Sequence, residues 1–216
     1  MVSIENLEIA ANKNLDIAQN EKNLAKDFKL TIKLEQKRAK TREILVKNEI
    51  ELAKMRELLA EKSNKLVKNK ANVKEILKFS DIDLEIEEKY TIYSEKIAEA
   101  QKNVAEVQRK IAHIEKDIAG DELKIINEKL NVAKQRETLG KKQLAYIKLV
   151  NTNAIEEKVA KAEKIYLEKQ KELHEAMKIV AEKSTNIRKK EDRIADLKKE
   201  LSEKLADREK IRPPAV

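Results

Sequence analysis

The chain has 216 residues, of which 41% are charged and 3% aromatic, and its formal net charge is +8. Globular domains are about 25% charged, so this composition indicates a thin core and a large solvated surface. The chain has no cysteine, which excludes disulfide frameworks and thiolate metal sites. No apolar run approaches the roughly 18 residues of a membrane-spanning helix, and the first residues do not resemble a signal peptide. We therefore expect a cytoplasmic protein.

Turn-forming residues are scarce along the whole chain. Two glycines, Gly120 and Gly140, and two prolines, Pro213 and Pro214, are present, whereas average usage is about 7% glycine and 5% proline. Tight turns need these residues because they require positive or preset φ angles. The chain therefore reverses direction rarely, and we predict an all-α fold in which both glycines are tolerated inside a helix or mark local kinks.

Local signals place the ends of the expected helices. Ser80 and Asp83 resemble a capping box, Asn153 can cap a further helix, and Pro213 cannot continue one. The sequence thus predicts very long helices in coiled-coil packing, over residues 2–78, 81–150 and 154–211. Together these form one elongated helical domain over 1–211, followed by a short non-helical tail over 212–216. The breaks near 80 and 152 are either hairpin turns or kinks.

Apolar residues recur every seven positions in three series. The first contains Leu45, Leu52, Leu59, Leu66 and Val73. The second contains Tyr90, Ile97, Val104, Ile111, Ile118, Ile125, Val132 and Leu139. The third contains Leu173, Val180, Ile187, Ile194 and Leu201. A sustained seven-residue repeat keeps one stripe facing a partner helix. We expect these residues to form the core or the contacts of an oligomer.

Candidate sites for chemistry are few. His113 and Asp117 lie one turn apart, but His113 follows Ile111 by two positions and is expected to point into solvent. No catalytic, cofactor-binding or metal-binding residues are predicted. Lysines at helical spacing form a candidate anion-binding ridge: Lys29, Lys33, Lys37 and Lys40, with Lys62 and Lys65 further along. The alternative is a solvated basic face that pairs with acidic faces of neighbouring chains.

These patterns favour a non-enzymatic structural coiled coil that binds itself and assembles into a filament or an elongated scaffold. The layout of three long helices resembles BAR-type membrane-curving dimers and the phage-shock and ESCRT-III class of membrane-remodelling polymers. This resemblance implies an alternative, remodelling of an anionic membrane surface. Nonspecific coating of nucleic acid through the basic clusters is a third possibility. No cofactor and no small-molecule substrate are expected.

Overall fold

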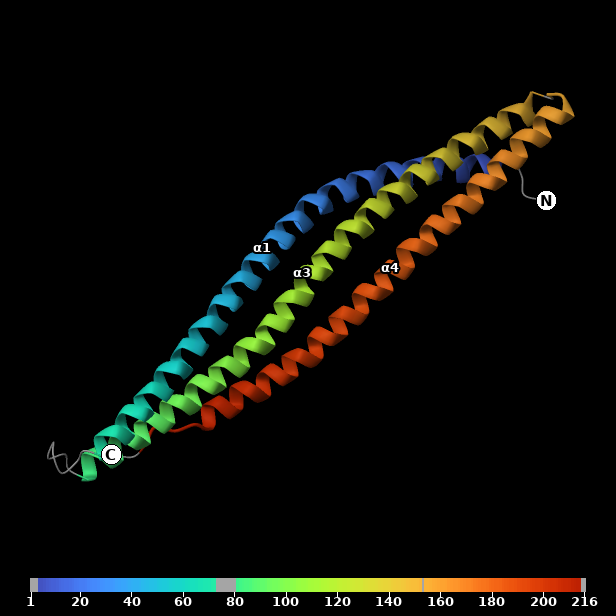
Figure 1. The fold of residues 1–216 in the computed structure, drawn as a ribbon. Coiled ribbons are helices and arrows are strands. Elements are labelled where there is room, and N and C mark those ends of the chain that lie inside the picture. The colour runs from blue at the N-terminus through green and yellow to red at the C-terminus, as the bar shows by residue number, and fades with distance from the viewer. Residues whose placement is uncertain (1–3, 73–80, 153, 215–216) are drawn as a thin grey trace. The chain divides into compact units, whose positions relative to one another are not determined.

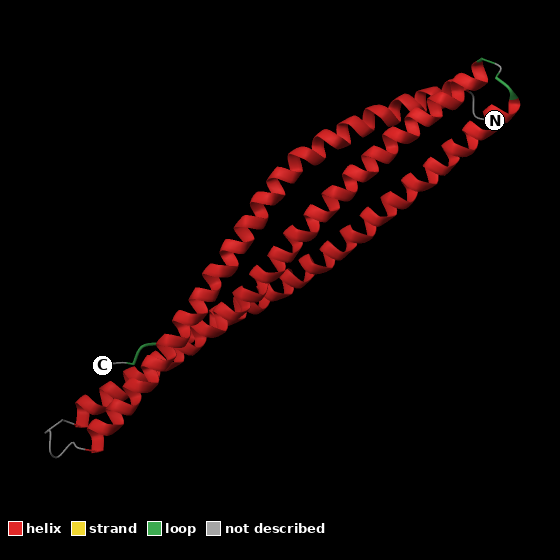
Figure 2. Ribbon diagram, turned by 45° about the horizontal axis from the view of Figure 1, so that its top comes forward, coloured by secondary structure: helices red, strands yellow, loops and turns green. Residues whose placement is uncertain are grey.

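The computed structural model describes residues 4–72, 81–152 and 154–214. Their helices are α1 (Ile4–Asn72), α3 (Asp81–Asn151) and α4 (Glu156–Lys210) (Figure 1). Figure 2 shows no strand among these residues. The predicted all-α fold of long helices is confirmed.

The helix ends follow the local chemistry. Helix α3 runs through both glycines without interruption, since a helix tolerates glycine at a cost of about 1 kcal/mol. Helix α4 ends two residues before Arg212 and the two prolines. The predicted end of the first helix at residue 78, and with it Val73, Ser80 and the N-cap Asn153, lie outside the described residues.

The contacts group the chain into two units. The first comprises residues up to 36 together with 118–190, and the second comprises 37–117 together with residues from 191 onward. Each unit therefore contains a segment of every helix. The single domain predicted over 1–211 stays a prediction.

In the first unit, α1 and α3 run antiparallel. Lys22 pairs with Glu137, and Lys29 Nζ donates to Asn127 Oδ1 at 3.3 Å. The residue numbers of the contacting residues therefore decrease along α3 as they increase along α1. A neighbouring side of α3, about 100° around the helix, packs on α4. A cluster there contains Val132, Leu139, Leu173 and Ala176, with Tyr166 and Val180 against it.

In the second unit the same antiparallel arrangement recurs. Lys70 pairs with Glu87 at 2.8 Å, and Glu57 pairs with Lys102 at 2.9 Å. A small cluster of Val46, Ile50 and Ala105 joins α1 to α3. On the α4 side, Lys110 Nζ lies 4.0 Å from Glu200 Oε1.

Alanines at seven-residue spacing form the contact between α1 and α3. In the second unit the buried residues of this kind are Ala39, Ala53 and Ala60 of α1 and Ala98, Ala105 and Ala112 of α3. In the first unit they are Ala11, Ala18 and Ala25 of α1 and Ala119 and Ala133 of α3. Small side chains let two helix backbones approach closely. Gly140 illustrates this, because a Cβ atom there would lie 2.9 Å from the Ala11 carbonyl oxygen.

Candidate interaction surface

The leucines of the first heptad series lie on the outside of α1. Their exposed fractions are 57% for Leu45, 49% for Leu52, 65% for Leu59 and 57% for Leu66. Each leucine precedes a buried residue of the α3-facing row by one position, as Leu59 precedes Ala60, and one position is about 100° around a helix. The sequence analysis left two roles open for this series. For these four residues, the prediction that they belong to the chain's own core is wrong, because the alanine row occupies the side of α1 that meets α3.

Two further apolar side chains extend this exposed surface. Met55 is 66% exposed and Leu58 is 51% exposed. We call the six residues Leu45, Leu52, Met55, Leu58, Leu59 and Leu66 the leucine face. Monomeric proteins rarely expose contiguous apolar surface of this extent unless it serves an interaction.

The other two series lie mostly inside. From the second series, Val104, Ile111, Ile125, Val132 and Leu139 are buried, Ile97 and Ile118 are half-buried, and Tyr90 is exposed. From the third series, Leu173, Ile187 and Ile194 are buried, and Val180 and Leu201 are half-buried. Val132 and Leu139 of the second series and Leu173 and Val180 of the third belong to the cluster that joins α3 to α4.

A groove of about 670 Å³ adjoins the leucine face in the second unit. Leu59 and Leu66 form one wall, and Tyr90, Tyr93 and Ile97 of α3 form the other. No described residue of α4 lines this groove, whereas Leu205 and Arg208 of α4 line a second groove beside Leu52 and Val104. The apolar side of α3 therefore continues beyond the region that α4 covers.

Exposed charged residues of both signs lie beside the leucine face. Glu49 and Glu51 lie near its N-terminal end, and Lys62 and Lys65 lie near its C-terminal end. All four side chains are exposed. Lys47 and Lys54 are also exposed in the N-terminal half, and Glu61 is exposed in the C-terminal half, so both halves carry charges of both signs.

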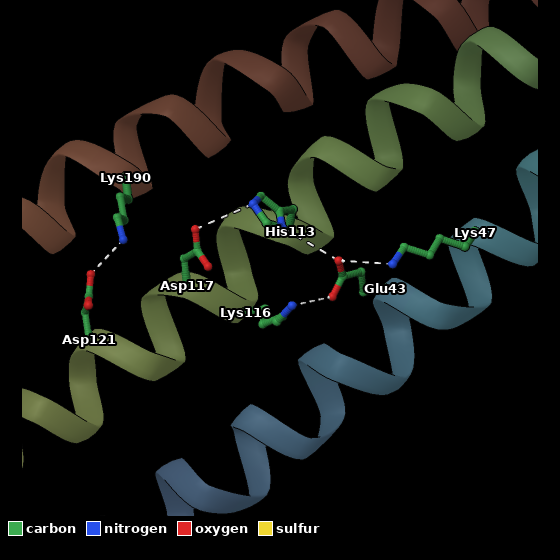
Figure 3. A network of polar contacts seen from close by, with 7 residues as sticks. All are labelled: Glu43, Lys47, His113, Lys116, Asp117, Asp121 and Lys190. Atoms are coloured by element: carbon green, nitrogen blue, oxygen red, sulfur yellow. Dashed lines mark hydrogen bonds and ion pairs between the residues drawn. The ribbon is translucent and has the colours of Figure 1, made fainter.

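Polar groups also occur inside the contact between α1 and α3. Figure 3 shows Glu43 of α1 facing Lys116 of α3, whose Nζ donates to Glu43 Oε2 at 2.9 Å. This hydrogen bond, together with the positive charges of Lys116 and Lys47, holds the pKa of Glu43 below its ordinary value. Asn64 lies in the same helix, and its Oδ1 atom is buried without a hydrogen-bond partner among the described residues.

His113 stands beside this pair. Its Nδ1 lies 3.6 Å from Glu43 Oε1 and its Nε2 lies 3.8 Å from Asp117 Oδ2. Its side chain is 59% exposed, in agreement with the outward orientation that the sequence suggested. Across the part of the chain that the structure describes, no group of three or more metal-ligating side chains gathers.

The first unit has its own ion pairs between α1 and α3. Glu137 accepts hydrogen bonds from Lys141, one turn along α3, and from Lys22 of α1. These two contacts lower the pKa of Glu137 to about 2. The residue before Glu137 is Arg136, whose Nε donates to Glu21 Oε2 at 3.1 Å. In Figure 3, Lys190 of α4 reaches Asp121 of α3 in the same way.

The lysines proposed as an anion-binding ridge are not all equivalent. Lys29 is half-buried, and its amine is directed to Asn127 of α3. In the first unit Lys33 is exposed, and in the second unit Lys37, Lys40, Lys62 and Lys65 are exposed. Anion binding by these residues stays a prediction.

The sequence analysis did not predict the alanine row of α1, because it assigned the more hydrophobic leucine series to the core or the oligomer contact. A signal for it was present, because alanine recurs at positions 11, 18, 25, 39, 53 and 60 and again at 98, 105, 112, 119 and 133. Such paired alanine repeats are typical of closely approaching helices. They would have left the leucines available for a different contact.

Comparisons with known proteins do not identify a family for this chain. No protein-family model, no curated protein and no solved structure matches the sequence. None of the described helices is sufficiently long and apolar to cross a membrane. Function is therefore argued from the surface of the chain.

Proposed function

We propose that this chain is a non-enzymatic structural coiled-coil protein that binds copies of itself and builds an elongated scaffold or filament. The observation that carries this proposal is the leucine face. Its four leucines share one heptad position and each is about half exposed or more. A row of leucines at this spacing supplies one of the two apolar positions per heptad that coiled-coil packing uses, and Met55 supplies the other in one heptad.

The energetic argument favours association over an isolated chain. Fully burying a leucine side chain is worth about 1.5–3 kcal/mol, so each half-exposed leucine retains about half of that gain for a partner. Six such side chains on each of two copies supply a favourable term that is comparable to the cost of association, which is about 4–15 kcal/mol. The cysteine-free composition fits a reducing compartment, and we include a cytoplasmic location in the proposal.

The experiment is sedimentation velocity over a range of protein concentrations at physiological salt. Self-association predicts a sedimentation coefficient that rises with concentration, because mass action populates the assembly. A single species with the mass of one chain at every concentration would contradict the proposal.

A further inference from the structure

We infer that the leucine face is the contact surface for a second copy of this chain, which docks antiparallel through its own leucine face about a two-fold axis. This inference rests on the proposed function and adds the surface and the polarity of the contact.

The apolar residues favour a helix as the occupant. Leu45 and Leu66 mark the ends of a row that is about 30 Å long at 1.5 Å per residue. Residues at seven-residue spacing stay on one side of a supercoiled helix, so a partner helix remains in contact along the row. Near Leu66 the groove walls of Tyr90 and Ile97 widen the apolar surface. The part of the leucine row outside the groove is an extended surface, which suits a helix better than a small ligand, because small ligands need a concave pocket.

The charges beside the leucine face favour a second copy of this chain as the partner, in the antiparallel orientation. Glu51, Leu58 and Lys65 share one heptad position at the border of the leucine face, and all three are exposed. Leu58 is midway between the two charged residues. A two-fold axis near Leu58 therefore places Glu51 of each copy opposite Lys65 of the other.

Other arrangements fit the charges less well. A parallel pairing would place Glu51 beside Glu51 and Lys65 beside Lys65 of the other copy, which is destabilising. A partner helix of one charge sign would attract either Glu51 or Lys65 and repel the other. A surface that is complementary to itself under a two-fold rotation forms a closed dimer. The dimer would then be the unit from which an elongated scaffold is built.

The first test replaces one leucine at the centre of the surface. Leu59→Glu introduces a charge into the contact and is expected to raise the Kd for self-association at least about tenfold, which corresponds to about 1.4 kcal/mol. Leu30→Glu is the matched control, because Leu30 is 67% exposed on α1 but lies outside the leucine face. It should leave the Kd unchanged. Both variants should keep the helical circular dichroism of the parent chain, since both side chains are solvent-exposed.

The second test addresses polarity at low salt, where surface charges are least screened. Glu51→Lys alone and Lys65→Glu alone each create two like-charge contacts in the antiparallel dimer, so each should weaken association about threefold to tenfold. The double variant, with both changes in one chain, restores opposite charges and should restore the Kd of the parent chain.

The outcomes separate this inference from the proposed function. A parent chain that stays monomeric overturns both. A parent chain that associates, but whose Kd is unchanged by Leu59→Glu, overturns the surface and leaves the proposed function standing. Single charge variants that do not weaken association, or a double variant that does not recover it, overturn the antiparallel polarity.

Discussion

Substitution of the two glycines by alanine separates a close helix contact from an open helix surface. In a helix interior, alanine is about 0.8–1 kcal/mol more favourable than glycine. At Gly120 a Cβ atom would come no closer than 4.0 Å to Gln36 Nε2, the end of a flexible side chain. Gly120→Ala should therefore stabilise the chain by most of that amount. For a chain of this length, 1 kcal/mol corresponds to about 2–4 °C in Tm.

Gly140→Ala should have the opposite sign. Its Cβ would lie 2.9 Å from the carbonyl oxygen of Ala11 and 3.0 Å from two carbons of Leu15. The backbone oxygen cannot move unless α1 itself shifts. Overpacking of this kind costs about 1–3 kcal/mol, which offsets or exceeds the gain in helix propensity. We expect a net loss of up to about 2 kcal/mol and a Tm lower by up to about 8 °C.

Thermal unfolding followed by circular dichroism measures both variants under one set of conditions. Because both changes are the same in chemistry and both lie in α3, their difference isolates the environment of each glycine. If Gly140→Ala raised the Tm as much as Gly120→Ala, the close approach of α1 and α3 at Ala11 would be refuted.

Three further predictions concern the contact between α1 and α3. Asn64→Leu should raise the Tm, because it removes a buried oxygen without a partner, a group that costs about 1–3 kcal/mol; an unchanged or lower Tm would contradict this. Ala112→Leu should lower the free energy of unfolding by about 1–3 kcal/mol, because this side chain is fully buried in a contact that has no room for a larger one; urea unfolding measures the change, and a neutral effect would argue against the tight contact. The folded-state pKa of Glu137, about 2, lies below its ordinary value of 4.5, so the stabilisation from this carboxylate is complete above about pH 4.5 and is lost as the pH falls toward 2. Glu137→Gln should flatten the dependence of Tm on pH in that window, and an unchanged dependence would show that these contacts are negligible.

The fold class followed from features that act locally. The near absence of glycine and proline predicts long helices, Ser80 predicts where one helix begins, and Pro213 predicts where another ends. The end of α4 at Lys210, before Pro213, agrees with this reading. These features depend on neighbouring residues in the chain, and a sequence displays them directly.

The orientation of α1 could not be predicted in the same way. Two heptad rows lie side by side on this helix, one with Leu59 and the other with Ala60, and hydrophobicity alone favours the leucine row. The alanine row meets α3 because Ala98 and Ala105 on α3 are equally small, so the choice depends on complementarity between distant segments. A single helix pattern also does not state whether its partner is in the same chain or in another copy.

The statement on which both proposals depend is that α1 meets α3 through its alanine row and leaves the leucine face outside. The chain has no native cysteine, so the reactivity of single cysteines introduced as Leu59→Cys and Ala60→Cys tests it directly in a dilute sample. Leu59 is 65% exposed and Ala60 is 4% exposed, so the thiol at position 59 should react rapidly with a labelling reagent and the thiol at position 60 slowly. Equal rates, or a faster reaction at position 60, would contradict the account.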